Sequence, residues 1–198
     1  LTTLTGAITG SGYSLTIDGS GDTTFSAGLN TSTNGTLTKN GTGTLTLSAA
    51  GSYTGATTVN AGTLAVTVNN ALGTSAAGTT IASGATLDLQ NVSSYSTTEA
   101  LTVNGGTIKT STGTSSFAGT IALGADSTFD ISGTQLTASG VISGSYAITK
   151  SSSGALILSG ANTYSGGTTL AAGTLRLGNP FALGTGSLTI SGGFLDNS

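Results

Sequence analysis

Apolar residues alternate with polar or small residues along almost the whole chain. Because residues i and i+2 of a β-strand share a face, each apolar doublet predicts a short strand with two side chains directed inward. No segment has apolar residues at helical spacing, and Gly interrupts nearly every gap, so no helix is predicted. The doublets are Leu45/Leu47, Leu64/Val66, Leu87/Leu89, Leu101/Val103, Ile121/Leu123, Phe129/Ile131, Leu156/Leu158, Leu175/Leu177 and Leu188/Ile190.

Asp-Gly and Asn-Gly turn signals, such as Asp18-Gly19 and Asn40-Gly41, bound these strands. Short strands with frequent turns are typical of an antiparallel sandwich or barrel, or of a parallel β-helix. The shortness of the doublets, the Gly, Asn and Ser turns and a long internal repeat favour an all-β, right-handed parallel β-helix. With about 20 residues per coil, residues 1–198 form one continuous unit of roughly nine to ten coils, about 45 Å long.

One stretch of the chain occurs twice. Residues 37–66 align without a gap to residues 148–177, so that Lys39 pairs with Lys150 and Tyr53 with Tyr164, each 111 positions apart. The match continues to residues 74 and 185, and about half of the aligned positions are identical. We interpret residues 37–74 and 148–185 as two copies of an internal repeat.

The repeat carries a family resemblance. Gly-Thr-Leu-Thr-Leu-Ser at 43–48, Asn-Thr-Tyr-Ser-Gly-Gly-Thr-Thr at 162–169 and Ala-Gly-Thr-Leu-Arg-Leu at 172–177 resemble the β-strand repeat of bacterial autotransporter passenger domains. The resemblance implies a secreted, extracellular segment at the bacterial cell surface, outside the outer membrane. It also implies a structural or adhesive role, since such repeats are scaffold.

The composition removes several classes of function. The chain has no Cys, His, Met or Trp, only 6% charged residues and a net charge of −3, whereas an average domain has about 25% charged residues. Disulfides and thiol chemistry are therefore absent, and no basic stripe is available for nucleic acid. No apolar run approaches the roughly 18 residues of a membrane-spanning helix. Because Leu1 is not a translation start, a processed product or a piece of a longer protein is expected.

Paired carboxylates are the first candidates for catalysis on a β-helix. Asp126 and Asp130 are four residues apart, which along one strand is about 13 Å, too far for the ~5–9.5 Å between glycosidase carboxylates, unless a turn at Ser127 brings them closer. Asp88 and Glu99 belong to no motif and are expected to be solvated. Without His or Cys no nucleophile triad forms, so we predict that the chain is not an enzyme and has no catalytic residue.

Metal, phosphate and ice sites each have a candidate stretch that falls short. Asp18-Gly-Ser-Gly-Asp22 resembles the start of a calcium loop but has Thr23 and Leu29 where an EF-hand needs Gly and Glu. The Gly-Thr-Gly sequences at 41–43 and 184–186 lack the third Gly and the helix of a phosphate loop. Thr44/Thr46 and Thr57/Thr58 suit an ice-binding face, but Ala65, Asp88, Ile157 and Arg176 interrupt such a face. No metal, cofactor or site residue is predicted.

Two interpretations apply to Tyr53 and Tyr164: stacking on a carbohydrate, or packing of the ring over a turn against the next coil. The second is favoured because the position recurs with the scaffold.

The apolar ends, with Leu1 and Leu4 at one and Phe194 and Leu195 at the other, predict open coils that pair with copies of the chain or with adjoining coils of a longer one. The alternative function is a carbohydrate-binding or carbohydrate-active module with host or surface glycans as partners.

Overall fold

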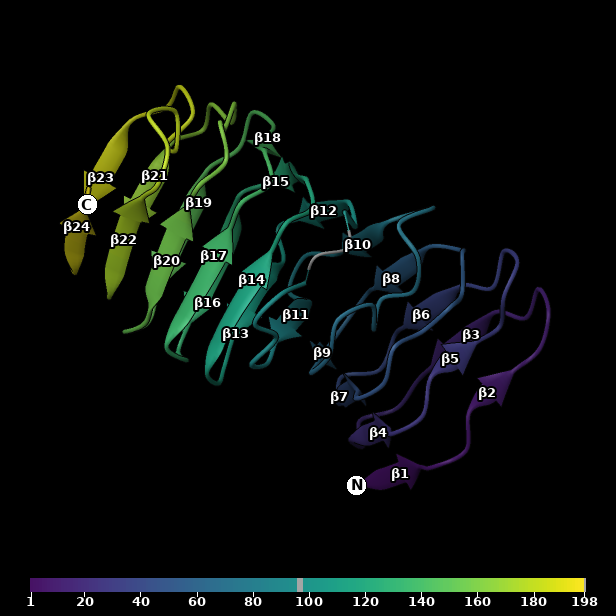
Figure 1. The fold of residues 1–198 in the computed structure, drawn as a ribbon. Coiled ribbons are helices and arrows are strands. Elements are labelled where there is room, and N and C mark those ends of the chain that lie inside the picture. Colours follow the sequence, from purple (N-terminus) through teal and green to yellow (C-terminus); the bar gives the residue numbers. More distant parts are fainter. Residues whose placement is uncertain (96–97, 198) are drawn as a thin grey trace.

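The computed structural model describes residues 1–95 and 98–197, which form 24 short strands and no helix, wound as a solenoid (Figure 1). The largest sheet has ten strands, in the order β1 (Thr2–Leu4), β4 (Thr23–Phe25), β7 (Thr44–Leu47), β9 (Thr63–Val66), β11 (Thr86–Leu89), β13 (Thr107–Thr110), β16 (Ser127–Ile131), β19 (Ile148–Ser151), β21 (Thr168–Leu170) and β23 (Leu188–Ile190). The strands of this sheet lie side by side in chain order, and each successive coil of the solenoid contributes one of them.

Two further faces complete each coil. A seven-stranded sheet contains β3 (Leu15–Ile17), β6 (Leu37–Lys39), β8 (Thr57–Val59), β10 (Thr79–Ile81), β12 (Leu101–Asn104), β15 (Ile121–Ala125) and β18 (Ile142–Ser143). A five-stranded sheet contains β14 (Thr114–Phe117), β17 (Gln135–Ala138), β20 (Ala155–Leu158), β22 (Thr174–Leu177) and β24 (Phe194–Asp196), and β2 (Ile8–Thr9) pairs with β5 (Leu29–Asn30). The five-stranded sheet and the β2–β5 pair occupy the third face.

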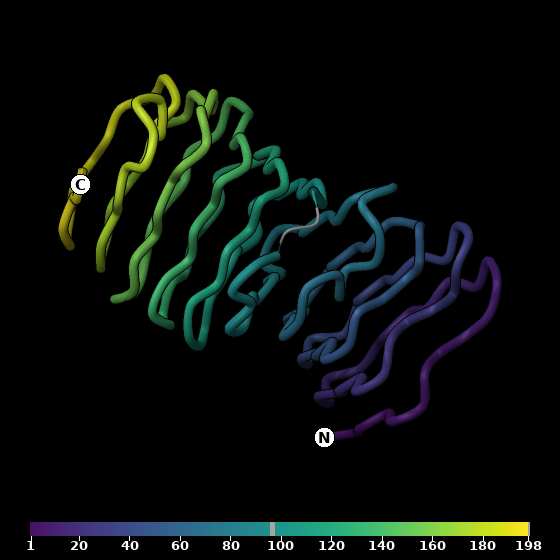
Figure 2. Tube along the Cα trace, in the orientation of Figure 1, coloured from purple at the N-terminus to yellow at the C-terminus, as the bar shows by residue number. Residues whose placement is uncertain are grey.

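The pairings between these strands are parallel, which confirms the predicted parallel β-helix over the antiparallel sandwich or barrel. Ten strands in the largest sheet correspond to about nine turns, coil stacked on coil from the N-terminal to the C-terminal end (Figure 2). The register pairs Leu47 with Val66 in the next turn, and Val66 with Leu89 in the turn after that. One turn is therefore close to the predicted length of about 20 residues.

The third face is continuous although its middle part has no regular strand. Ser52 N–H donates to Leu29 O at 3.0 Å, which stacks a loop on β5. Farther along, Tyr95 forms a parallel bridge with Phe117, and the two rings stack with centroids 5.6 Å apart. Backbone hydrogen bonds and ring stacking thus connect successive coils on this face where regular strands are missing.

The predicted doublets form the core. In the ten-stranded sheet Leu45 stacks on Leu64, Leu64 on Leu87, Leu87 on Ile108 and Ile108 on Phe129, all buried. Each such side chain contributes roughly 1.5–3 kcal/mol on burial. Coils therefore adhere through identical or similar residues at identical positions, which is why a period-two pattern suffices to specify the interior.

The outer surface of the ten-stranded sheet has a column of threonines. Eight successive strands place a Thr at the same register position: Thr44, Thr63, Thr86, Thr107, Thr128, Thr149, Thr169 and Thr189. The neighbouring column holds Asp88, Lys109 and Asp130 on consecutive strands, so opposite charges are adjacent and like charges are not. The uniform part of this face is one residue wide.

One corner of the solenoid is a stack of glycines. A Cβ on Gly119 would overlap the carbonyl of Glu99, one on Gly140 would overlap the carbonyl of Gly119, and one on Gly160 would overlap that of Gly140. Successive coils approach backbone to backbone here, and Gly is the residue that permits such an approach. The corner thereby fixes the rise from one coil to the next.

Candidate functional site in the repeat copies

The two repeat copies fold alike but lie on different faces of the solenoid. From Leu45 in β7, five register steps along the ten-stranded sheet lead to Lys150 in β19. Leu156, the repeat equivalent of Leu45, lies beyond Lys150 in the chain, in β20 of the five-stranded sheet. The repeat spacing is therefore longer than five whole turns, and the second copy is displaced by one face around the axis.

Each copy buries a lysine in the same nest of backbone carbonyls. Lys150 Nζ donates to Ser151 O at 2.7 Å, Ser152 O at 2.8 Å and Ala172 O at 3.1 Å. Burial lowers the pKa of Lys150 to about 8, while the nearby Asp130 carboxylate raises that pKa. These bonds join one coil (151–152) to the next (172), so the ammonium group stabilises a corner.

Lys39 makes the equivalent contacts in the first copy. Its Nζ donates to Gly41 O and, at 3.3 Å, to Ala61 O in the next coil. Burial lowers the pKa of Lys39, and Asp22 and Asp18 raise it. Gly41 and Ala61 align with residues 152 and 172 of the second copy. The lysine nest is thus a property of the repeat, and the sequence alignment pairs the two lysines without revealing their burial.

The two repeat tyrosines are also buried and equivalently bonded. Tyr53 Oη and Thr57 Oγ1 share a hydrogen bond of 2.6 Å, and Tyr164 Oη and Thr168 Oγ1 share one of the same length. Burial raises the pKa of both phenols, and the threonine bonds lower it by a smaller amount. Neither ring is accessible to a carbohydrate, and the packing interpretation agrees with the structure.

The two carboxylates that are candidates for a catalytic pair are engaged separately. Asp126 lies at the corner between β15 and β16, where its Oδ1 accepts from Ala147 N–H at 2.8 Å. Asp130 pairs with Lys109 at 3.1 Å and accepts from Ser152 Oγ. Although burial raises the pKa of Asp130, the Ser152 and Lys109 bonds outweigh it and the pKa is lowered. Each of these carboxylates links neighbouring coils, and they do not form an acid–base pair with each other.

Asp88 and Glu99 correct the expectation that they are solvated. Asp88 is buried, and its oxygens accept from Ser111 N–H and Gln90 Nε2, both at 2.9 Å, which offsets the cost of burying the charge. Glu99 is 1% exposed, and its Oε1 accepts from Thr79 Oγ1 at 2.7 Å. Its Oε2 has no hydrogen-bond partner among the described residues. Burial raises the pKa of Glu99, and the Thr79 bond lowers it by a smaller amount.

No metal site is found in residues 1–95 and 98–197, where no three His, Cys, Asp or Glu side chains cluster. Of the calcium-like stretch, Asp22 Oδ1 accepts from Thr44 N–H at 2.8 Å and so joins two coils. The glycines of the Gly-Thr-Gly sequences pack against backbone of the preceding coil, as at Gly41 and Gly184. The same described residues contain no helix long and apolar enough to span a membrane.

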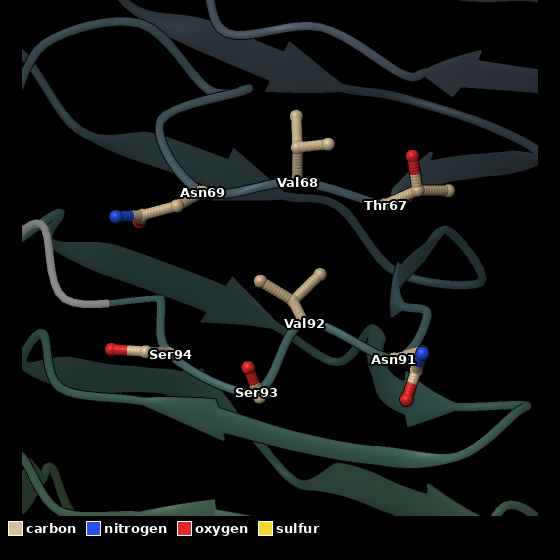
Figure 3. A pocket seen from close by; sticks show the side chains of 7 residues that line it. All are labelled: Thr67, Val68, Asn69, Asn91, Val92, Ser93 and Ser94. Atoms are coloured by element: carbon tan, nitrogen blue, oxygen red, sulfur yellow. The ribbon is translucent and has the colours of Figure 1, made fainter.

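A groove opens between two coils directly after the last strand of the first repeat copy. Thr67, Val68 and Asn69 form one wall, and Asn91, Val92, Ser93 and Ser94 the other, around a volume of about 430 Å³ (Figure 3). In Figure 3, Val92 points from its own coil toward the coil of Val68, while Asn69 and Ser94 project to the same side. The groove is shallow, uncharged and open to solvent.

A second groove of about the same volume lies at the equivalent position of the second copy. Leu177, Gly178, Asn179 and Pro180 form its first wall, and Asn197 of the next coil faces them. Residues 178–180 follow the last strand of the second copy as residues 67–69 follow that of the first. Sequence reasoning missed both grooves, because alternation of apolar and polar residues locates strands and carries no signal for the loops that separate coils.

Comparison with known proteins supports the repeat. The model of the passenger-associated transport repeat matches residues 37–66 and again residues 148–177. No curated protein and no solved structure matches the chain. The matched ranges coincide with the two copies aligned from the sequence, and this repeat is a structural passenger repeat rather than an enzyme family.

Proposed function

We propose that this chain, which carries two passenger-associated transport repeats and so contains β-helical passenger segments of the autotransporter type, is a load-carrying rod of a secreted bacterial surface protein. Its role is to hold other parts of a surface structure apart, or to build a fibre. The proposal gives the repeats a mechanical purpose, and no chemistry.

The observation that supports this role most strongly is the direction of the polar contacts that recur in both repeat copies. Lys150 and Tyr164 of the second copy, like Lys39 and Tyr53 of the first, are buried and bonded inside the rod. If the recurring lysine and tyrosine bound a ligand, their polar atoms would be directed toward solvent. Here they hold the coils in place.

The end coils are suited to receive further coils. Ile190 in β23 is 52% exposed and Leu4 in β1 is 41% exposed, although their register partners Leu170 and Phe25 are buried. Stacking another coil on each end would cover this apolar surface and pair the edge strands β1 and β23. In a fibre the added coil belongs to a second copy, and in a longer chain to adjoining residues.

Electron microscopy and sedimentation of the purified chain test the fibre role. Filaments whose length grows in steps of about 45 Å are expected, together with a sedimentation coefficient that rises with concentration. Ile190→Lys places a charge on the end coil and is expected to abolish the assembly. Val141→Lys is the matched control, because this aliphatic side chain is 38% exposed but lies outside both end coils. Isolated short rods at all concentrations, for the wild type and both variants, would exclude a fibre of copies.

A further inference from the structure

We propose that the groove following the last strand of each repeat copy is a binding site for neutral oligosaccharides. The sites concerned are the groove of residues 67–69 and 91–94, and the groove of residues 177–180 and 197. This inference does not rest on fibre formation, because a rod that forms no fibre can still bind a glycan along its side.

The recurrence of the groove is the first argument. Residues 67–69 and 178–180 occupy the same repeat positions, yet no position carries the same residue and the two segments lie on different faces of the solenoid. The recurring part is the near wall, which in both copies directly follows a strand, β9 in the first copy and β22 in the second. The end of that strand, rather than one particular side chain, is what the two grooves have in common.

The chemistry of the walls selects the ligand class. Each groove has an asparagine on both walls, Asn69 and Asn91 in the first and Asn179 and Asn197 in the second. A primary amide offers both donors and acceptors, which matches the hydroxyl groups of a sugar. Val68 in the first groove and Pro180 in the second add apolar surface for the C–H face of a pyranose ring. Neither lining includes a charged side chain, which disfavours phosphate, sulfate and charged peptide ligands.

One amide in each groove is held in place by the backbone that follows it. Asn69 Oδ1 accepts from Asn70 N–H at 3.1 Å, and Asn179 Oδ1 accepts from Phe181 N–H at 2.8 Å. Such a bond fixes the orientation of the amide before a ligand arrives, so less side-chain entropy is lost on binding. The grooves therefore share a positioned amide as well as a shape.

The backbone around the first groove argues against an added peptide strand. Thr67 N–H donates to Leu47 O at 3.1 Å, on the coil away from the groove. Asn91 N–H donates to Thr112 O at 3.0 Å, also on a coil away from the groove. Strand addition gains its affinity from main-chain hydrogen bonds, and these donors are already used. Recognition is thus left to the amide and hydroxyl side chains.

The binding of a single groove is expected to be weak. The linings contain no aromatic ring, and shallow, solvent-open sites bury little of their ligand. Dissociation constants in the millimolar range follow for a single groove. A polysaccharide that reached both grooves of one rod, or the grooves of several neighbouring rods, would bind more tightly through effective concentration.

The test is an NMR titration of the whole chain with a neutral glucan pentasaccharide, its sulfated form and an uncharged tetrapeptide. The side-chain amides of Asn69 and Asn179 are expected to shift saturably with the neutral glucan alone. Ser93→Leu fills the first groove, because Ser93 is exposed and its hydroxyl points toward the coil of Val68 (Figure 3). This variant is expected to bind at least about tenfold more weakly at the first groove and normally at the second.

Ser75→Leu is the matched control, since Ser75 is an exposed serine outside both grooves. It should leave both grooves unchanged. The inference is overturned if the neutral glucan shifts no groove residue, if the sulfated glucan binds equally well, or if Ser93→Leu binds like the wild type. Saturable binding of the tetrapeptide alone would also overturn it and assign the groove to peptide.

Discussion

Tyr53 and Tyr164 occupy the same position of the two repeat copies on different faces of the rod, and each phenol is hydrogen-bonded at 2.6 Å to the hydroxyl of the threonine four residues later. The bond closes a loop onto the strand that follows it, with Thr57 in β8 and Thr168 in β21. Because the contact is local, it is preserved when the whole unit moves to another face.

Removing the phenol oxygen should destabilise the rod. Tyr164→Phe leaves the buried Thr168 hydroxyl without its partner, which is expected to lower the free energy of unfolding by about 1–3 kcal/mol. Urea denaturation, monitored by far-UV circular dichroism, measures the decrease in the free energy of unfolding. Tyr146→Phe removes the same atom from a half-exposed ring and should change the stability by less than about 0.5 kcal/mol. Equal effects of the two variants would contradict the structural role of the bond.

The buried lysine should matter far more than a surface one. Lys150→Met keeps much of the side-chain volume but leaves three carbonyl oxygens without the ammonium group, at an expected cost of about 2–4 kcal/mol. Lys109→Met breaks a partly exposed ion pair with Asp130 and should cost at most about 1 kcal/mol. Urea denaturation midpoints at pH 7 would measure both losses of stability. A Lys150→Met variant as stable as the wild type would show that the nest is dispensable.

Glu99 should make the rod less stable as the pH rises. Its pKa is raised by burial above the ordinary value of 4.5, so the folded state favours the protonated acid. The favourable contribution is complete below that ordinary pKa and is lost as the pH rises toward the raised folded pKa. Glu99→Gln cannot ionise and keeps an acceptor for Thr79. We expect a flatter stability profile at higher pH and a gain on the order of 1 kcal/mol at neutral pH.

Thermal melts of wild type and Glu99→Gln between pH 4 and pH 8 measure this difference. Asp126→Asn serves as the control, because Asp126 is exposed. A change that both variants share would come from the loss of a carboxylate in general and not from the burial of Glu99. Parallel profiles for wild type and Glu99→Gln would mean that Glu99 is ionised without penalty in the folded chain.

A methyl group at the glycine corner should disrupt the stacking of coils. In Gly140→Ala the new Cβ overlaps the carbonyl of Gly119, so that the backbone of one coil has to move. We expect a loss of about 2 kcal/mol or more, measured by urea denaturation. Gly6→Ala is the control, since a Cβ at Gly6 meets nothing within 4 Å. A well-tolerated Gly140→Ala would show that the rise between coils is adjustable.

The strands and the interior follow directly from the sequence pattern. Doublets such as Leu45/Leu47 and Leu156/Leu158 are inward, and the repeat aligned at 37–66 and 148–177 is the one matched by the family model. Parallel stacking could also be anticipated, since short identical doublets at coil-length intervals pack best on their own equivalents. The predictions that the chain has no site residue and that its open ends pair with further coils remain predictions.

Other features lie beyond a pattern of apolar and polar residues. Lys39 lies two residues after the buried Leu37, so the strand alternation directs its side chain inward. A sequence pattern nevertheless favours placing a charged side chain in solvent. Asp88 has an outward position in β11 and is nevertheless buried, because Gln90 and Ser111 bind its oxygens. Burial in such cases depends on a partner from the same loop or the next coil, which only the three-dimensional register identifies.

The displacement of the second copy by one face has a consequence for how such proteins lengthen. The lysine and tyrosine contacts lie within each repeat copy and its neighbouring coil, so the copy can fold on any face of the solenoid. Such a unit need not be duplicated in whole turns. Successive duplications at this spacing would place the same loop at a new azimuth each time. A long array would therefore carry its loops as a spiral, available to approach from every direction.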